Sequence, residues 1–314
     1  MSVTGKDFLD LDCLEKQEIN DILETATSMK EIFTRTIKKV PALRGKTIVN
    51  LFFEPSTRTK SSFAIAAKRL SADVVSISKK MSSVAKGETL LDTAKTMEAM
   101  GADVVVVRHS APGAARFLGE QLRARVLNAG DGTHAHPTQA LLDLYTIKEK
   151  FGEITGLKVL IIGDIAHSRV ARSNIWGLTR LGAEVRVCGP ATLLPRDISR
   201  MGVAVFTDLE QALMDIDVMN ILRIQRERQE SAFFPSLGEY TYFYGITKER
   251  LAELQLDDLL IMHPGPMNRG VEIDGKVADS KNSVITEQVT NGVAIRMALL
   301  YLLSGGEEEN GALT

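Results

Sequence analysis

Residues 47–70, TIVNLFFEPSTRTKSSFAIAAKRL, pass from an apolar run through a proline into a segment with helical spacing. The almost continuous apolar run is typical of a strand that is covered on both faces. Pro55 ends the strand, and the polar residues after it open a helix. A strand followed directly by a helix is the repeating unit of a parallel α/β sheet.

The same alternation continues on both sides of this unit. An amphipathic helix over 15–38 precedes it, and strands and helices then follow in turn as far as residue 151. The further strands expected here cover 72–78, 102–109 and 125–130. The further helices expected here cover 88–100, 114–122 and 136–151.

A second series of apolar runs starts near Gly156. We expect its strands within 158–164, 184–190, 203–208, 218–223 and 259–266, and a terminal helix over 284–303. Residues 224–245 show no clear period and are predicted to be irregular.

Two domains follow from these two series, each with a central parallel sheet flanked by helices and joined by interdomain helices. The first is expected to span 1–140 together with a C-terminal helix at about 288–314, and the second 141–287.

Composition narrows the class of protein. The chain has 314 residues, a net charge of -2 and 44% hydrophobic residues, the profile of a soluble globular protein without the basic excess of a nucleic-acid binder. Cys13 and Cys188 form no CxxC pair, so a reducing cytoplasm fits. The first residues have no apolar segment behind basic residues, so we do not expect them to act as a secretory signal, and no run approaches the ~20 apolar residues needed to span a bilayer.

The polar residues that carry chemistry gather where strands end. In EPSTRT, Ser56, Thr57, Arg58 and Thr59 open a helix, and a helix N-terminus with hydroxyls and a guanidinium binds phosphate readily. An ordinary Ser/Thr helix cap beside a solvated arginine is the alternative.

A second cluster is HAHPTQ, where His136 and Gln139 lie at a helix start and suit a polar carbonyl. Surface histidines, or a zinc site with His134, are the alternatives, although no further Cys/His set stands at ligand spacing.

Four more clusters also follow strands or precede helices. They are Lys86 before a helix, Arg169 after IIGD, Arg223 and Gln225 after NIL, and the turn HPGP at 263–266. The IIGD strand end alone would suit a dinucleotide, but the G-x-G-x-x-G fingerprint is absent. Each cluster alone reads as structural, yet α/β folds place their ligands at strand ends.

Together these motifs resemble the transcarbamoylase family, and within it the branch that acts on aspartate, over roughly residues 6–303. The resemblance implies transfer of a carbamoyl group from carbamoyl phosphate to the amine of L-aspartate, without a metal or organic cofactor. It implies that Ser56, Thr57, Arg58 and Thr59 hold the phosphate, and that Thr59, Arg108 and His136 address the carbonyl oxygen.

The resemblance also assigns the remaining motifs. Gln139 and the backbone carbonyls around Pro264 and Gly265 would receive the carbamoyl NH₂. The aspartate carboxylates would be held by Arg169, Arg223 and Gln225, together with Lys86. Ser82, or the adjacent Ser83, and Lys86 would reach into the site of a neighbouring chain in a homotrimer.

Rival interpretations stay open. Ornithine transcarbamoylases share the fold but typically carry an HCLP turn, whereas this chain has HPGP, whose Gly265 is more flexible than the larger residue of many relatives. A non-catalytic Rossmann-type binding protein would explain IIGD alone. Larger assembly with regulatory chains or a dihydroorotase-like protein is a further possibility that the sequence leaves undecided.

Overall fold

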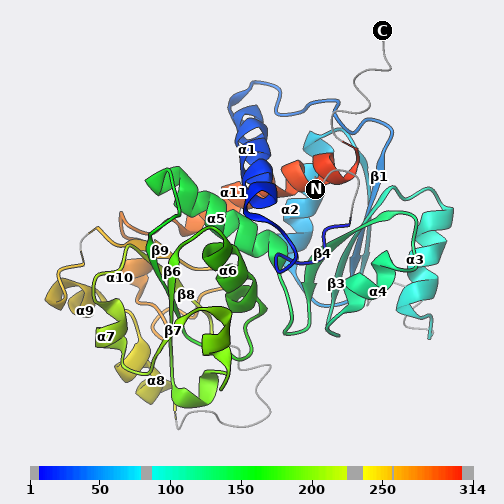
Figure 1. Cartoon of the computed structure of the whole chain (residues 1–314). Coiled ribbons are helices and arrows are strands. Elements are labelled where there is room, and N and C mark those ends of the chain that lie inside the picture. Colours follow the sequence, from blue (N-terminus) through cyan, green and yellow to red (C-terminus); the bar gives the residue numbers. More distant parts are fainter. Residues whose placement is uncertain (1–6, 79–86, 225–235, 257, 306–314) are drawn as a thin grey trace. The chain divides into compact units, whose positions relative to one another are not determined.

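The computed structural model describes residues 7–78, 87–224, 236–256 and 258–305 (Figure 1). The chain divides into two compact units, and the division falls within two helices, α5 and α11. Unit 1 comprises Met1–Leu141 and Thr290–Thr314, and unit 2 comprises Leu142–Val289. The prediction of two parallel α/β sheets flanked by helices is confirmed.

Unit 1 contains a four-stranded sheet in the order β2-β1-β3-β4, with every neighbouring pair parallel. Its strands are β1 (Thr47–Phe52), β2 (Asp73–Ser78), β3 (Val104–His109) and β4 (Arg125–Asp131). Its helices are α1 (Lys16–Glu31), α2 (Thr57–Arg69), α3 (Leu90–Ala99), α4 (Ala114–Gly119), the start of α5 (Pro137–Phe151) and most of α11 (Ile285–Leu303).

Both faces of this sheet are covered, which explains the continuous apolar runs. On one face Leu51 of β1 and Val105 of β3 pack with Ala94 of α3 and Leu118 of α4. Successive strand residues point to opposite faces, so the neighbouring apolar residues face the other way. Figure 1 shows α2 on the side of the sheet opposite α3 and α4.

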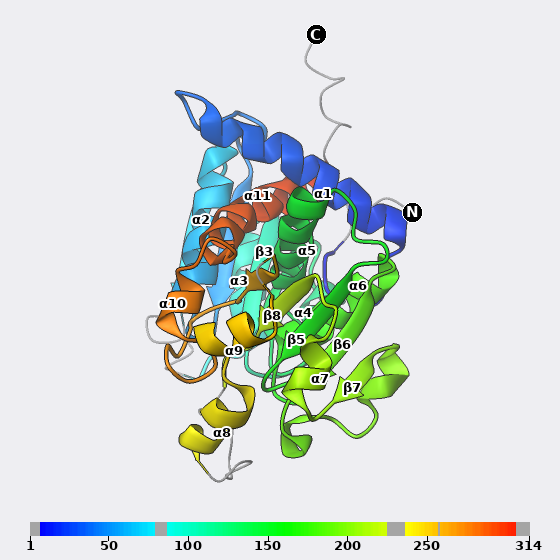
Figure 2. The same ribbon diagram turned by 90° about the vertical axis from the view of Figure 1, so that its left-hand side faces the viewer.

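Unit 2 contains a five-stranded parallel sheet in the order β7-β6-β5-β8-β9. Its strands are β5 (Lys158–Ile162), β6 (Glu184–Cys188), β7 (Ala204–Phe206), β8 (Val218–Ile221) and β9 (Leu260–Met262). Its helices include α6 (Arg169–Arg180), α7 (Leu209–Leu213), α8 (Leu237–Tyr244), α9 (Lys248–Glu253) and α10 (Gly275–Ala278). Figures 1 and 2 show α6 and α7 flanking this sheet, and Figure 1 places them on opposite sides.

Two predicted elements differ from the structure. The helix expected over 15–38 ends at Glu31 and continues only as a 3-10 turn over Ile32–Thr34. Arg35 is extended, with φ -72° and ψ 151°, and the β-branched threonines around it favour that break.

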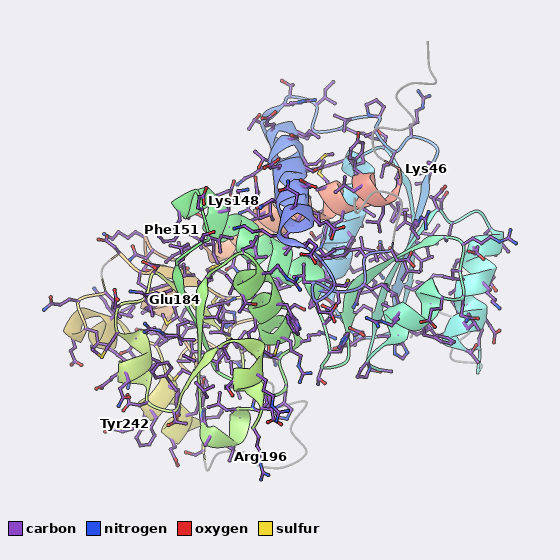
Figure 3. The ribbon with its side chains drawn as sticks, viewed as in Figure 1. Lys46, Lys148, Phe151, Glu184, Arg196 and Tyr242 are labelled. Atoms are coloured by element: carbon purple, nitrogen blue, oxygen red, sulfur yellow. The ribbon has the colours of Figure 1, made fainter. Side chains whose placement is uncertain are left out.

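The segment predicted to be irregular contains α8. Its first turn is capped by Ser236, whose hydroxyl oxygen accepts a hydrogen bond from the Glu239 N–H at 3.1 Å. The S-x-x-E spacing of Ser236 and Glu239 was a signal for this helix start. The hydrophobic period is hidden because outward-facing residues of α8 are aromatic, such as Tyr242, which is 73% exposed (Figure 3).

Candidate active site

Three adjacent strands of unit 1 bring the predicted residues to one edge of the sheet. Because β1, β3 and β4 are parallel neighbours, their carboxyl ends lie at the same edge. The start of α2 follows β1, Arg108 lies near the end of β3, and His136 follows β4. The backbone N–H of Phe53 donates to the Arg108 carbonyl oxygen at 2.9 Å, which ties the first two strand ends together.

The N-terminus of α2 has the features of an anion site. Ser56 occupies the N-cap position in an extended conformation, and its hydroxyl makes no capping hydrogen bond within the described part of the chain. Thr57 and Arg58 are exposed, whereas Thr59 is buried. No acidic residue stands in the first turn, so the positive end of the helix dipole is not offset there by a carboxylate of the helix.

Arg108 and His136 form a contacting pair at the ends of β3 and β4. One guanidinium nitrogen of Arg108, Nη1, lies 3.3 Å from His136 Nε2 and donates to the Ala129 carbonyl oxygen at 3.3 Å. Its Nε lies 3.7 Å from an oxygen of Glu54. Since an arginine only donates, the network assigns Nε2 of His136 as the acceptor and places the ring proton on Nδ1.

The start of α5 is arranged by the backbone of the same histidine. The N–H groups of Gln139 and Ala140 donate to the His136 carbonyl oxygen at 3.0 and 3.2 Å. His136 is buried, 5% exposed, and Gln139 is half-buried. The histidine therefore lies in a fixed position, which corrects the alternative of a surface loop histidine.

The loop between β4 and His136 is held by Asp131, a residue that sequence reasoning missed. Its carboxylate accepts hydrogen bonds from the Gly113 N–H at 2.6 Å, the Asn128 amide at 2.9 Å and the Ala135 N–H at 3.2 Å. His134 Nδ1 lies 3.1 Å from the same carboxylate, and its Nε2 lies 3.3 Å from Asp10. The Gly-Asp-Gly run after an apolar strand was the available signal for a carboxylate that organises a turn.

In unit 2 the predicted residues again follow strand ends. Arg169 is the first residue of α6 and is buried, and the preceding Ser168 caps that helix by accepting from the Ala171 N–H at 3.1 Å. Arg223 follows β8 and is half-buried. At the end of β5, Gly163 has φ 127°, and a Cβ there would lie 2.8 Å from the Leu222 carbonyl oxygen. Only glycine allows this approach of two strand ends.

The predicted Pro264–Gly265 turn follows β9 and is shaped by His263, whose side chain is buried. Its Nδ1 accepts from the Gly265 N–H at 2.8 Å, so the ring proton lies on Nε2, 3.3 Å from an oxygen of the buried Glu272. Burial of this carboxylate beside an N–H donor keeps the imidazole orientation fixed.

Four predicted residues, Ser82, Ser83, Lys86 and Gln225, lie outside the described residues. Across the described ranges, no group of three or more His, Cys, Asp or Glu side chains is placed to hold a metal ion, which gives the zinc alternative at His134 no support. Among the helices of those ranges, none is long and apolar enough to cross a membrane.

At the end of α5, Lys148 and Phe151 lie near the surface, as Figure 3 shows.

The fold and the site define a class of protein: an α/β protein that gathers cationic and hydroxyl side chains at a helix N-terminus and at the neighbouring strand ends. Family models match almost the whole chain, over residues 6–149 as the carbamoyl-P binding domain and over residues 155–303 as the Asp/Orn binding domain. The chain belongs to the aspartate/ornithine carbamoyltransferase family and is a carbamoyltransferase.

Individual relatives agree with this assignment. The chain is 74% identical to the aspartate carbamoyltransferase catalytic subunit of Halothermothrix orenii, over 98% of both chains. It is similar to the Trypanosoma cruzi aspartate transcarbamoylase in complex with N-(phosphonacetyl)-L-aspartic acid, with a TM-score of 0.85 at 30% identity over 96% of both chains. The ornithine carbamoyltransferase of Pyrococcus furiosus gives the same TM-score and identity, over 98% of this chain and 100% of that one. Overall shape therefore does not select the amino-acid acceptor.

Proposed function

We propose that this chain transfers the carbamoyl group of carbamoyl phosphate to the amine of L-aspartate, giving N-carbamoyl-L-aspartate and phosphate, the committed step of de novo pyrimidine biosynthesis. The observation that carries the donor half is the α2 N-terminus beside the Arg108–His136 pair, at the ends of neighbouring strands. The high identity to an aspartate carbamoyltransferase catalytic subunit supports aspartate as the acceptor.

The donor site follows from the charges at these strand ends. Ser56, Thr57, Arg58 and Thr59 bind the phosphate through hydroxyls, a guanidinium and helix N–H groups. Thr59, Arg108 and His136 address the carbamoyl oxygen, where negative charge develops when the amine attacks. One such donor is commonly worth about 3 kcal/mol in the transition state. The carbamoyl NH₂ is received by Gln139 and by the carbonyl oxygens of Pro264 and Gly265.

The acceptor site uses cations for a dicarboxylate. Arg169, Arg223 and Gln225, with Lys86, bind the two carboxylates of aspartate. The amine, in its neutral form, attacks the carbonyl carbon of carbamoyl phosphate. The bond from this carbon to the phosphate oxygen then breaks, and the departing phosphate takes the proton from the attacking amine. Holding the amine and the carbonyl carbon close together and correctly oriented supplies much of the remaining rate enhancement.

The product of the reaction tests this assignment directly. Purified protein given carbamoyl phosphate should form N-carbamoyl-L-aspartate from aspartate and far less product from ornithine, as separated by chromatography. A preference for ornithine would reassign the acceptor, and no transfer to either would reject the function.

The assembly proposed is a cytoplasmic homotrimer in which Ser82 and Lys86 complete the site of a neighbouring chain. Inactive Arg58→Ala and Lys86→Ala chains, dissociated and reassembled in equal amounts, should then regain activity at about a quarter of all sites by closed-ring counting. Reassembled trimers without activity would place Lys86 in its own chain's site or outside the site. The mass of the native assembly, measured in the source cell extract, decides whether regulatory chains or a dihydroorotase-like protein join it.

A further inference from the structure

Asp143, in the middle of α5, is a fully buried carboxylate surrounded by amide side chains of unit 2. Its Oδ2 accepts a hydrogen bond from the Asn174 amide at 2.8 Å and from the Asn220 amide at 3.3 Å. Its Oδ1 accepts from the Gln288 amide at 2.7 Å. Gln288 in turn accepts, through Oε1, a hydrogen bond from the backbone N–H of His263 at 2.9 Å.

Each of these amides belongs to a segment that leads to a predicted substrate-binding residue: two lead to acceptor residues, and the third leads to the turn that would receive the carbamoyl NH₂. Asn174 lies on α6, which begins at Arg169. Asn220 lies on β8, three residues before Arg223. Gln288 lies in the first turn of α11 and holds the backbone of His263, directly before the Pro264–Gly265 turn.

A buried carboxylate is costly unless donors surround it, and hydrogen bonds to a charged group contribute about 1.5–3 kcal/mol each. The same fold would be held together more simply by apolar residues at these positions. The Asp143 network joins the three segments through directional contacts instead, and directional contacts fix position more closely than apolar packing does.

We propose that Asp143 is a positioning residue for both substrates, holding the α6 start and the β8 end for the amino-acid acceptor and the turn after β9 for the carbamoyl NH₂ of the donor. The inference rests on the proposed function in one respect, because it takes Arg169 and Arg223 as the residues that bind the acceptor carboxylates and the Pro264–Gly265 turn as the one that receives the carbamoyl NH₂. Asp143 itself touches no substrate in this account and acts only through the segments that it joins.

The donor pattern of the network predicts what an isosteric change does. In Asp143→Asn the amide oxygen keeps the two asparagine donors, and the new NH₂ group faces the NH₂ group of Gln288. Two donors cannot bond, so the link to Gln288 and the His263 turn is lost. Gln288→Glu alone places a second carboxylate against Asp143 and is also unfavourable.

The double variant Asp143→Asn/Gln288→Glu restores every link. The new amide at position 143 donates to one oxygen of the new carboxylate at position 288, whose other oxygen still accepts from the His263 N–H. The number of hydrogen bonds and the single buried negative charge are both unchanged. Because this exchange of donor and acceptor keeps both side chains buried, it separates the effect of the hydrogen bonds that position the segments from the effect of burial alone.

The test is steady-state kinetics and equilibrium binding on folded variants, after the wild-type chain has been shown to use aspartate. Asp143→Asn, which loses the link to the turn, should weaken carbamoyl phosphate binding on the order of thirtyfold, about 2 kcal/mol. Asn174→Ala, which loses the α6 link, should raise the KM for aspartate by a similar factor and leave carbamoyl phosphate binding within about threefold. The double variant should return carbamoyl phosphate binding to within about threefold of wild type. Thr179→Val, which removes a hydrogen bond internal to α6, is the control and should change neither constant.

Three results would overturn the inference: unchanged carbamoyl phosphate binding in Asp143→Asn, an unchanged KM for aspartate in Asn174→Ala, or a folded double variant without recovery. If Asp143→Asn does not fold, Asn174→Ala removes only the α6 link, and an unchanged KM for aspartate there is equally decisive. A wild-type chain that does not carbamoylate aspartate would instead reject the proposed function, which is a separate outcome.

Discussion

Asp131 in unit 1 and Asp143 in unit 2 are both buried carboxylates that fix strand ends, but their partners come from different distances along the chain. The partners of Asp131 stand 3, 4 and 18 positions away. Those of Asp143 stand 31, 77 and 145 positions away. The loop before His136 is thus held by partners close to it in the chain, whereas the Asp143 network joins segments that are spread over the whole of unit 2.

The two carboxylates also differ in the chemistry of their partners. Asp131 lies beside the imidazole of His134, which also contacts Asp10. Burial chiefly, with the nearby Asp12 and Asp131, raises the pKa of Asp10 to about 6, while the Leu11 N–H and His134 act in the opposite direction. The amides that donate to Asp143 are uncharged.

The largest effect is expected at the anion site of unit 1. Arg58→Ala removes the guanidinium from the α2 N-terminus and should lower kcat about a thousandfold, equivalent to about 4 kcal/mol, because negative charge builds up on the departing phosphate in the transition state. Its thermal unfolding should stay near that of wild type, because Arg58 is exposed. Lys68→Ala, at the other end of the same helix, is the control for loss of charge. Near-normal turnover in folded Arg58→Ala would contradict the assignment of Arg58 to the carbamoyl phosphate site.

The next effect concerns the loop that presents His136. Asp131→Asn places an amide NH₂ against N–H donors and should cost about 3 kcal/mol of unfolding free energy, together with a loss of kcat. Urea denaturation and initial rates measure the two. Asp103→Asn is the matched control, since Asp103 accepts the Thr47 N–H at 2.7 Å at the opposite edge of the same sheet. A variant that keeps both stability and turnover would show that Asp131 does not hold the loop.

A smaller effect should appear in the pH dependence of stability. Because the folded-state pKa of Asp10 is raised, the folded chain binds more protons than the unfolded chain between about pH 4 and pH 6. The unfolding free energy should therefore fall by about 2 kcal/mol from this group as the pH rises through that window. Asp10→Asn should make the unfolding free energy depend less on pH, as measured by urea unfolding at about pH 4 and about pH 6. An unchanged slope would separate Asp10 from the pH response of unit 1.

The same comparison explains what the sequence could reveal. Ser56–Thr59 and His136 are found by reading along the chain, because a strand, a turn and a helix start are contiguous there. Asp143 stands in an ordinary helical pattern, and its importance appears only when three distant amides converge on it. The fold was predictable because each strand and helix carries its own hydrophobic pattern. Short helices such as α8 were missed because their length and aromatic surface hide that pattern.

The division of labour between the two units is tested most directly by carbamoyl phosphate binding to Arg223→Ala. Since we propose that Arg223 binds the acceptor, the variant should show a much higher KM for aspartate while its dissociation constant for carbamoyl phosphate stays within about threefold of wild type, under 1 kcal/mol. Calorimetric titration in the absence of aspartate measures that constant. A loss of carbamoyl phosphate binding of a hundredfold or more, roughly 3 kcal/mol, would place Arg223 in the donor site and contradict the account.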